Sequence, residues 1–108
     1  LMKDDSVYIE HMLECIQKIL EYTQEGKEHF LRSAITQDAV VRNLQVMAES
    51  SQRISSEVKL KYPNIPWRDI SGFRNILVHD YLGLDLKVVW SVVEQDIPAL
   101  RDALKVSV

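Results

Sequence analysis

The longest stretch of this chain without a glycine or a proline lies in its middle, and its core positions recur at intervals of three and four residues. That spacing is typical of an amphipathic helix. We therefore predict one helix from about Thr36, which can cap its first turn, to about Lys61. The whole chain has only three glycines and three prolines, which favours long helices over many short strands. The predicted core positions of this helix are Val40, Leu44, Met47, Ser51, Ile54 and Val58.

The same spacing and a few break points define the other helices. Together they predict an all-α, up-and-down bundle of four to five helices, with residues 1–108 as a single domain. The expected ranges are residues 6–22 with Ser6 as N-cap, a short helix within 27–33, residues 67–81 after a break at Pro63 and Pro66, and a last helix from Asp85 with a restart near Asp96 because of Pro98.

Composition narrows the class of protein. A hydrophobic fraction of 46% argues against disorder, and a net charge of −3 argues against a wholly basic, nucleic-acid-coating surface. The lone Cys15 cannot form an internal disulfide, which suggests a reducing compartment. No leader peptide or membrane span is visible, so we expect a cytoplasmic protein with no membrane contact. No ligand spacing supports a metal site, and no cofactor is expected.

Basic residues gather in the middle of the chain. They allow either a local basic groove or a solvated surface of mixed charge. The residues are Arg53, Lys59, Lys61, Arg68 and Arg74.

Arg74, His79 and Tyr81 place a fixed cation, a proton carrier and a phenol within eight residues. An arginine fork suits phosphate oxygens, and a histidine can take and return a proton near neutral pH. On an unbroken helix, however, a separation of five residues sets two side chains about 140° apart. Arg74 and His79 can therefore meet only if His79 lies at the helix end or if a second subunit supplies one of them.

Gly72 lies just before these residues, inside the predicted helix. A glycine in a helix interior costs on the order of 1 kcal/mol relative to alanine. We therefore expect a neighbouring backbone to pass very close to Gly72.

The run Arg74-Asn75-Ile76-Leu77-Val78-His79-Asp80-Tyr81 resembles the signature of the HEPN superfamily, in its HepT-like toxin branch. That signature is an arginine, a polar residue, three further residues, a histidine, any residue and a tyrosine. Segments before and after the run resemble the same branch, so the resemblance covers nearly the whole chain. They are Gln37–Leu44, Ile65-Pro66-Trp67, Val89-Trp90 and Asp96-Ile97-Pro98.

The resemblance implies an up-and-down helical bundle that forms a homodimer, with the motifs lining a cleft at or beside the interface. It implies a metal-independent endoribonuclease that leaves a 2′,3′-cyclic phosphate and acts as the toxin of a toxin–antitoxin module. The implied antitoxin is a minimal nucleotidyltransferase that silences the toxin by adding AMP to the motif tyrosine. Carried onto this chain, Arg74 and His79 are the catalytic pair, Tyr81 is the modification site, and Asn75 and Asp80 help to orient the pair.

Two other interpretations stay open from the sequence. In one, the protein is a non-catalytic helical partner of a nucleotidyltransferase, and the Arg74–His79 segment is a docking surface. In the other, it is a purely structural helical dimer in which Arg74 pairs with an acid such as Asp80 or Glu94.

Overall fold

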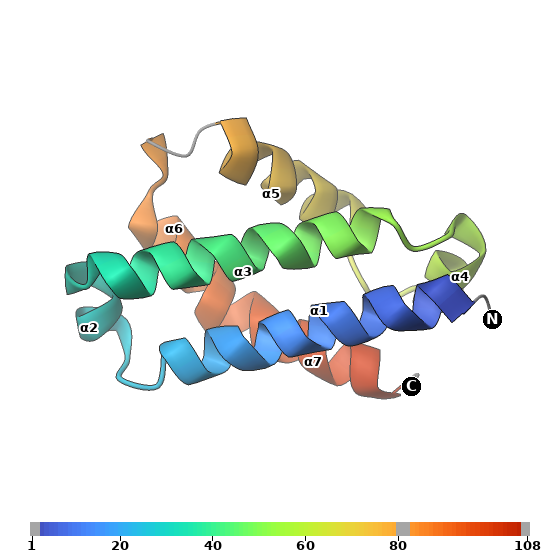
Figure 1. Ribbon diagram of the computed structural model, residues 1–108, viewed down its shortest axis with the longest axis horizontal. Coiled ribbons are helices and arrows are strands. Elements are labelled where there is room, and N and C mark those ends of the chain that lie inside the picture. The colour runs from blue at the N-terminus through green and yellow to red at the C-terminus, as the bar shows by residue number, and fades with distance from the viewer. Residues whose placement is uncertain (1–2, 80–82, 107–108) are drawn as a thin grey trace.

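The fold is a helical bundle, seen in a computed structural model that describes residues 3–79 and 83–106 (Figure 1). Within these ranges the regular elements are all helices, and no strand occurs. In chain order they are α1 (Lys3–Tyr22), α2 (Lys27–Arg32), α3 (Ala34–Gln52), α4 (Ser56–Leu60), α5 (Trp67–His79), α6 (Leu86–Ser91), the π-helical turn η2 (Val92–Asp96) and α7 (Ile97–Val106).

Successive long helices run in opposite directions along the bundle. α1 and α3 lie side by side, α5 packs on α3 on the side away from α1, and α7 crosses near α1 (Figure 1). The short α2 packs against α3 and α6 at one end of the molecule. This arrangement confirms the predicted all-α, up-and-down bundle. The molecule measures 42 × 27 × 20 Å along its principal axes.

The core forms where the apolar faces of α1, α3 and α7 meet. Met12 and Ile16 of α1, Leu44 of α3 and Leu104 of α7 are fully buried. Burial of one such side chain stabilises a fold by about 1.5–3 kcal/mol. The predicted core positions of the middle helix are all buried, which confirms that its three-four spacing faces the core.

The cap of α3 differs from the prediction. Ser33, not Thr36, is the N-cap, and its side-chain oxygen accepts a hydrogen bond from the backbone N–H of Thr36 at 3.2 Å. The hydroxyl of Thr36 instead lies 3.2 Å from Nε2 of His29. Thr36 is therefore a first-turn residue that helps to hold α2 against α3.

The single long helix predicted up to Lys61 was wrong, because α3 ends at Gln52 and α4 begins anew at Ser56. Ser55 caps α4 by accepting a hydrogen bond from the backbone N–H of Val58 at 3.2 Å. Asp5 of α1 accepts hydrogen bonds from the backbone N–H and the hydroxyl of Ser55, at 2.7 and 3.1 Å. A buried side chain from another helix thus satisfies the donors that the break frees.

The predicted start of the first helix was also wrong. α1 begins at Lys3, so Ser6 lies inside the helix instead of capping it. Its predicted end was right, since α1 stops at Tyr22 and the chain turns through Gly26, whose φ of 91° favours glycine.

A π-helical turn separates α6 from α7. At its end the backbone N–H of Ile97 donates to the carbonyl of Val92, five residues back. The wider turn precedes Pro98, which has no N–H to offer to a regular helix. This confirms the predicted restart near Asp96, at the cost of one irregular turn.

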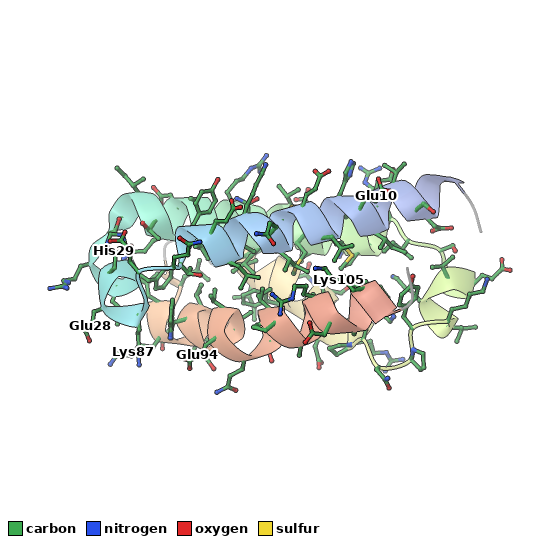
Figure 2. All side chains as sticks on the ribbon, turned by 90° about the horizontal axis from the view of Figure 1, so that it is seen from below. Glu10, Glu28, His29, Lys87, Glu94 and Lys105 are labelled. Carbon is green, nitrogen blue, oxygen red and sulfur yellow. The ribbon has the colours of Figure 1, made fainter. Side chains whose placement is uncertain are left out.

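Charged side chains of both signs cover the outer surface. Glu10, Glu94 and Lys105 are exposed and project from different helices (Figure 2). Across residues 3–79 and 83–106, no helix is both long and apolar enough to cross a membrane.

Candidate active site

The helix α5 carries the described part of the candidate site. It starts directly after Pro66, whose carbonyl accepts from the backbone N–H of Ile70 at 3.1 Å. Ile70 and Leu77, two turns apart, are buried and fix α5 against α3. Arg74 lies between these two buried residues along the helix, so packing against the core fixes the position of its backbone.

Arg74 is half-buried and keeps its positive charge free of any described acid. Its Nη1 donates to Oδ1 of the neighbouring Asn75 at 3.3 Å, on the exposed side of the helix. Its Nε is shielded from solvent and has no hydrogen-bond partner in the described part of the chain. The ion pairs found there join other residues. A guanidinium with an unused donor and no neutralising carboxylate is suited to binding an anion.

The structural interpretation, in which Arg74 pairs with an acid, was wrong for Glu94. Glu94 is exposed, forms no ion pair with Arg74, and projects from η2 at the outer edge of the molecule (Figure 2). The other acid named there, Asp80, lies outside the described residues.

His79 is the last residue of α5 and is exposed. Because α5 is regular from Trp67 to His79, Arg74 and His79 project about 140° apart around its axis. The sequence set two conditions for convergence, and the first, a helix that ends at His79, depends on Asp80, which lies outside the described residues. Tyr81, the predicted modification site, lies outside the described residues, as does Asp80.

Gly72 has open space around it, so the expected close approach of another backbone was wrong within this chain. Gly72 is exposed, and a Cβ atom built on it would meet no atom within 4 Å. Among the described residues, no contact accounts for a glycine at this position.

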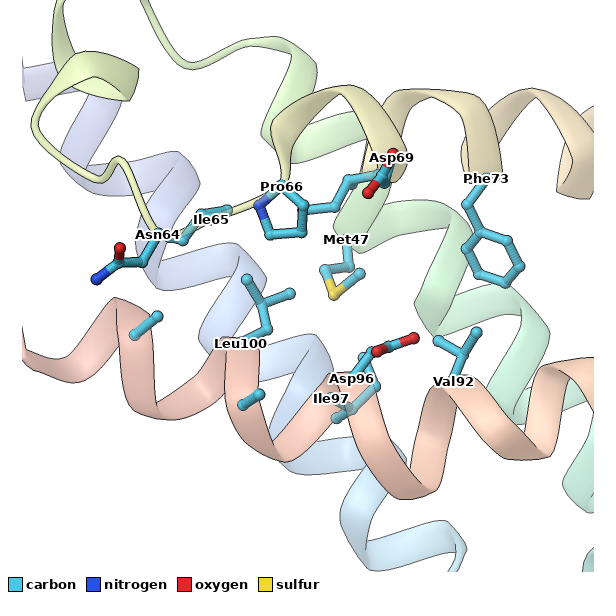
Figure 3. A pocket seen from close by; sticks show the side chains of 13 residues that line it. Met47, Asn64, Ile65, Pro66, Asp69, Phe73, Val92, Asp96, Ile97 and Leu100 are labelled. Carbon is cyan, nitrogen blue, oxygen red and sulfur yellow. The ribbon is translucent and has the colours of Figure 1, made fainter.

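An apolar groove of about 470 Å³, which the sequence did not signal, lies between α5 and the η2–α7 segment (Figure 3). Its charged lining residues are two acids, Asp69 and Asp96, and neither Arg74 nor His79 lines it. Arg74 and His79 therefore lie outside this groove. The apolar lining includes Met47, Ile65, Ile70, Phe73, Val92, Ile97 and Leu100.

A known protein family matches most of the chain. The profile of the family described as "Ribonuclease HepT-like" matches residues 12–107. The chain belongs to the HepT-like ribonuclease family. No solved structure gives a significant match.

Several curated relatives of this HepT-like chain are similar over most of its length. A Thermococcus cleftensis protein named "Probable ribonuclease HepT" is 41% identical over 87% of this chain and 86% of its own length. A Methanocaldococcus jannaschii protein named as a "Putative RNase" is 30% identical over 96% of both chains. A second protein of that organism, named "Gamma-glutamylcyclotransferase and putative RNase", is 38% identical over 96% of this chain. This chain spans about half of that relative, 47% of its length.

The described part of this HepT-like chain contains no cluster of three or more His, Cys, Asp or Glu side chains suited to hold a metal ion. The candidate residues that the structure describes are Arg74, Asn75 and His79 of α5. These groups can bind an anion, donate a hydrogen bond and move a proton.

Proposed function

We propose that this HepT-like protein is a metal-independent endoribonuclease, and that it is the toxin of a toxin–antitoxin module. The proposal rests mainly on Arg74. Its side chain is half-buried, its Nε has no hydrogen-bond partner and no carboxylate neutralises it in the described part of the chain. An exposed histidine, His79, lies on the same helix. RNA supplies the missing anion, because each of its phosphates carries a negative charge. We take residues 1–108 as one domain of this kind.

The active protein is a homodimer in this proposal. Within one chain, Arg74 and His79 point about 140° apart around α5. A twofold partner that packs beside α5 brings the arginine of one chain toward the histidine of the other. Ile76, which is 50% exposed on α5, gives such a contact an apolar element. The motifs of both chains then line a shared cleft.

The reaction is an internal transfer at phosphorus. One His79 takes the proton of a ribose 2′-hydroxyl, and the 2′-oxygen forms a bond to the adjacent phosphorus. The bond between phosphorus and the 5′-oxygen of the next nucleotide breaks, that oxygen takes a proton from water, and His79 returns the proton it took to the solvent, so each site needs one Arg74 and one His79. The products are a 2′,3′-cyclic phosphate and a 5′-hydroxyl. Arg74 stabilises the negative charge that builds on the phosphoryl oxygens.

Regulation in this proposal acts on Tyr81. The antitoxin, a minimal nucleotidyltransferase, transfers AMP from ATP to Tyr81, two residues after His79: the phenol oxygen loses its proton and bonds to the α-phosphorus, and pyrophosphate leaves. The added group is bulky and anionic, so it fills the cleft and repels RNA phosphate.

The test is cleavage of a labelled single-stranded RNA by purified protein in excess EDTA. Wild type should cut and leave a 2′,3′-cyclic phosphate, identified by mass spectrometry, and His79→Ala should not cut. His11→Ala is the matched control, since His11 is an exposed histidine on α1. Cleavage that stops in EDTA and returns with added metal would contradict the metal-independent mechanism.

Growth of cells that express the protein tests the toxin role. Wild type should slow growth, and His79→Ala should not. Equal growth of the two strains, with no RNA cut by either protein, would instead favour a non-catalytic docking partner of a nucleotidyltransferase.

A further inference from the structure

Gly72 is the starting point, because no contact with residues 3–79 or 83–106 explains a glycine there. Alanine would favour the helix, and there is room for its methyl group on every side. A glycine without a reason inside the chain points to a close approach by something outside it, since glycine lets another molecule reach the backbone.

The residues around Gly72 show what kind of molecule fits. At about 100° per residue, Asn75 and His79 lie within about 20° of Arg68 around α5, and Gly72 within about 40°. All four are exposed, so they form one continuous outer face of the helix. This face carries a cation at one end and the proposed catalytic histidine at the other, with no side chain at Gly72 between them.

The charge of Arg68 is available for a ligand. It forms no ion pair with any acid in residues 3–79 and 83–106. The adjacent Asp69 projects about 100° away around the helix and lines the apolar groove. A polar face with one unpaired guanidinium is suited to a phosphate backbone more than to an apolar helix of another chain.

We infer that Arg68 and Gly72 form an RNA-binding track along α5 that positions a strand whose cleaved phosphate lies at His79. This inference rests on the ribonuclease activity proposed above. Arg68 binds a phosphate several nucleotides away from the cleaved bond, because eleven helical residues span about 16 Å. Because Gly72 has no side chain, the RNA strand can pass close to the helix backbone there. Both are positioning residues and take no part in the chemical step.

The first experiment measures RNA binding against salt concentration. The probe is a fluorescent single-stranded RNA of about 12 nucleotides, within the usual range of single-strand site sizes, and the proteins carry His79→Ala to prevent cutting. Arg68→Ala should weaken binding several-fold and lower the slope of log K against log salt by about 0.7, the value for one phosphate of a single strand. Lys18→Ala, which removes one charge from an exposed position on α1 across the bundle, should leave the slope unchanged.

The second experiment uses Gly72→Ala with an active His79. The melting temperature should rise by several degrees, the mass in solution should stay that of wild type, and KM for the 12-nucleotide RNA should rise several-fold. If Gly72→Ala raises the melting temperature and also raises KM, the loss of RNA binding cannot be due to misfolding. Arg68→Ala should raise KM for the same RNA but leave cleavage of a dinucleotide unchanged, because a dinucleotide has a single phosphodiester and cannot reach Arg68.

Three results would overturn the inference. They are a salt slope for Arg68→Ala equal to that of Lys18→Ala, wild-type use of the long RNA by Gly72→Ala, or loss of the dimer in Gly72→Ala, which would assign the glycine to a contact between chains. If the wild-type protein cuts no RNA, the proposed function fails, while the salt slopes still decide whether Arg68 binds a phosphate.

Discussion

The carboxylate of Asp5 accepts two hydrogen bonds from Ser55, one from its backbone N–H at 2.7 Å and one from its hydroxyl at 3.1 Å. The two residues are 50 positions apart in the chain. Asp5 is only 3% exposed, so this contact joins the start of α1 to the break between α3 and α4 inside the protein.

We predict that Asp5→Ala lowers the free energy of unfolding by about 1–3 kcal/mol, because it leaves a partly buried N–H without a partner. Asp5→Asn should lose less, since its side-chain oxygen can still accept from the backbone N–H. Urea unfolding measures both. Glu10→Ala, at an exposed site of α1, should change the value by no more than about 0.5 kcal/mol. An Asp5→Ala protein as stable as Glu10→Ala would contradict the bracing role.

The helical fold can be predicted from local sequence patterns. The break in the middle helix after Gln52 cannot. The spacing of Leu44 and Met47 predicts a buried helix face, because burial depends on helix periodicity alone. The break needs Asp5 to satisfy the N–H of Ser55, and a contact over 50 residues leaves no local signal in the sequence. The predicted helix therefore had the correct face and the wrong length.

The candidate site was predictable in part for a similar reason. The sequence correctly places Arg74 and His79 on one helix. It also gives the angle between them, because helix geometry is fixed. It could not show that the space around Gly72 is open. A glycine there is compatible with a close neighbour from the same chain and equally with one from another molecule, so the sequence does not distinguish the two.

Cys15 should make stability fall at alkaline pH. Burial raises the pKa of its thiol above the ordinary value of 9.0, and the nearby Lys18 ammonium opposes this only in part. The folded protein then holds the proton more tightly than the unfolded chain does. The stabilising contribution is complete below about pH 9 and is lost as the pH rises through the folded-state value.

The measurement is the free energy of unfolding of wild type minus that of Cys15→Ala, followed from about pH 8 to about pH 10. Subtraction removes the other groups that titrate in this range. The difference should decrease as the pH rises. A difference that stays constant or increases would show that burial does not favour the protonated thiol.

Arg74→Ala should lower cleavage by about 10²–10³-fold, the usual loss when one donor to a transition-state oxyanion is removed. Its melting temperature should change little, because the exposed hydrogen bond to Asn75 is the one polar contact of its side chain among the described residues. Arg74→Lys should retain part of the activity, since it keeps the charge but not the planar fork. Full activity in Arg74→Ala would remove the arginine from the site.

Tyr81 should take up AMP when the protein is produced together with a minimal nucleotidyltransferase. Intact-mass analysis should show added AMP on the wild type and none on Tyr81→Phe, and the modified protein should cut RNA more slowly. Tyr22→Phe, at an exposed tyrosine of α1, is the control and should be modified like wild type. Addition of AMP to Tyr81→Phe would place the modification elsewhere.

The shared cleft is tested most directly by mixing two inactive variants. Arg74→Ala and His79→Ala chains, produced together with different affinity tags, form mixed dimers in which one of the two sites has both an intact arginine and an intact histidine. Random pairing at a twofold interface should then restore about one quarter of wild-type cleavage, although each variant alone is inactive. Tandem purification through both tags confirms that mixed dimers are present. Mixed dimers that cut no more RNA than either variant alone would show that the two chains do not share a site.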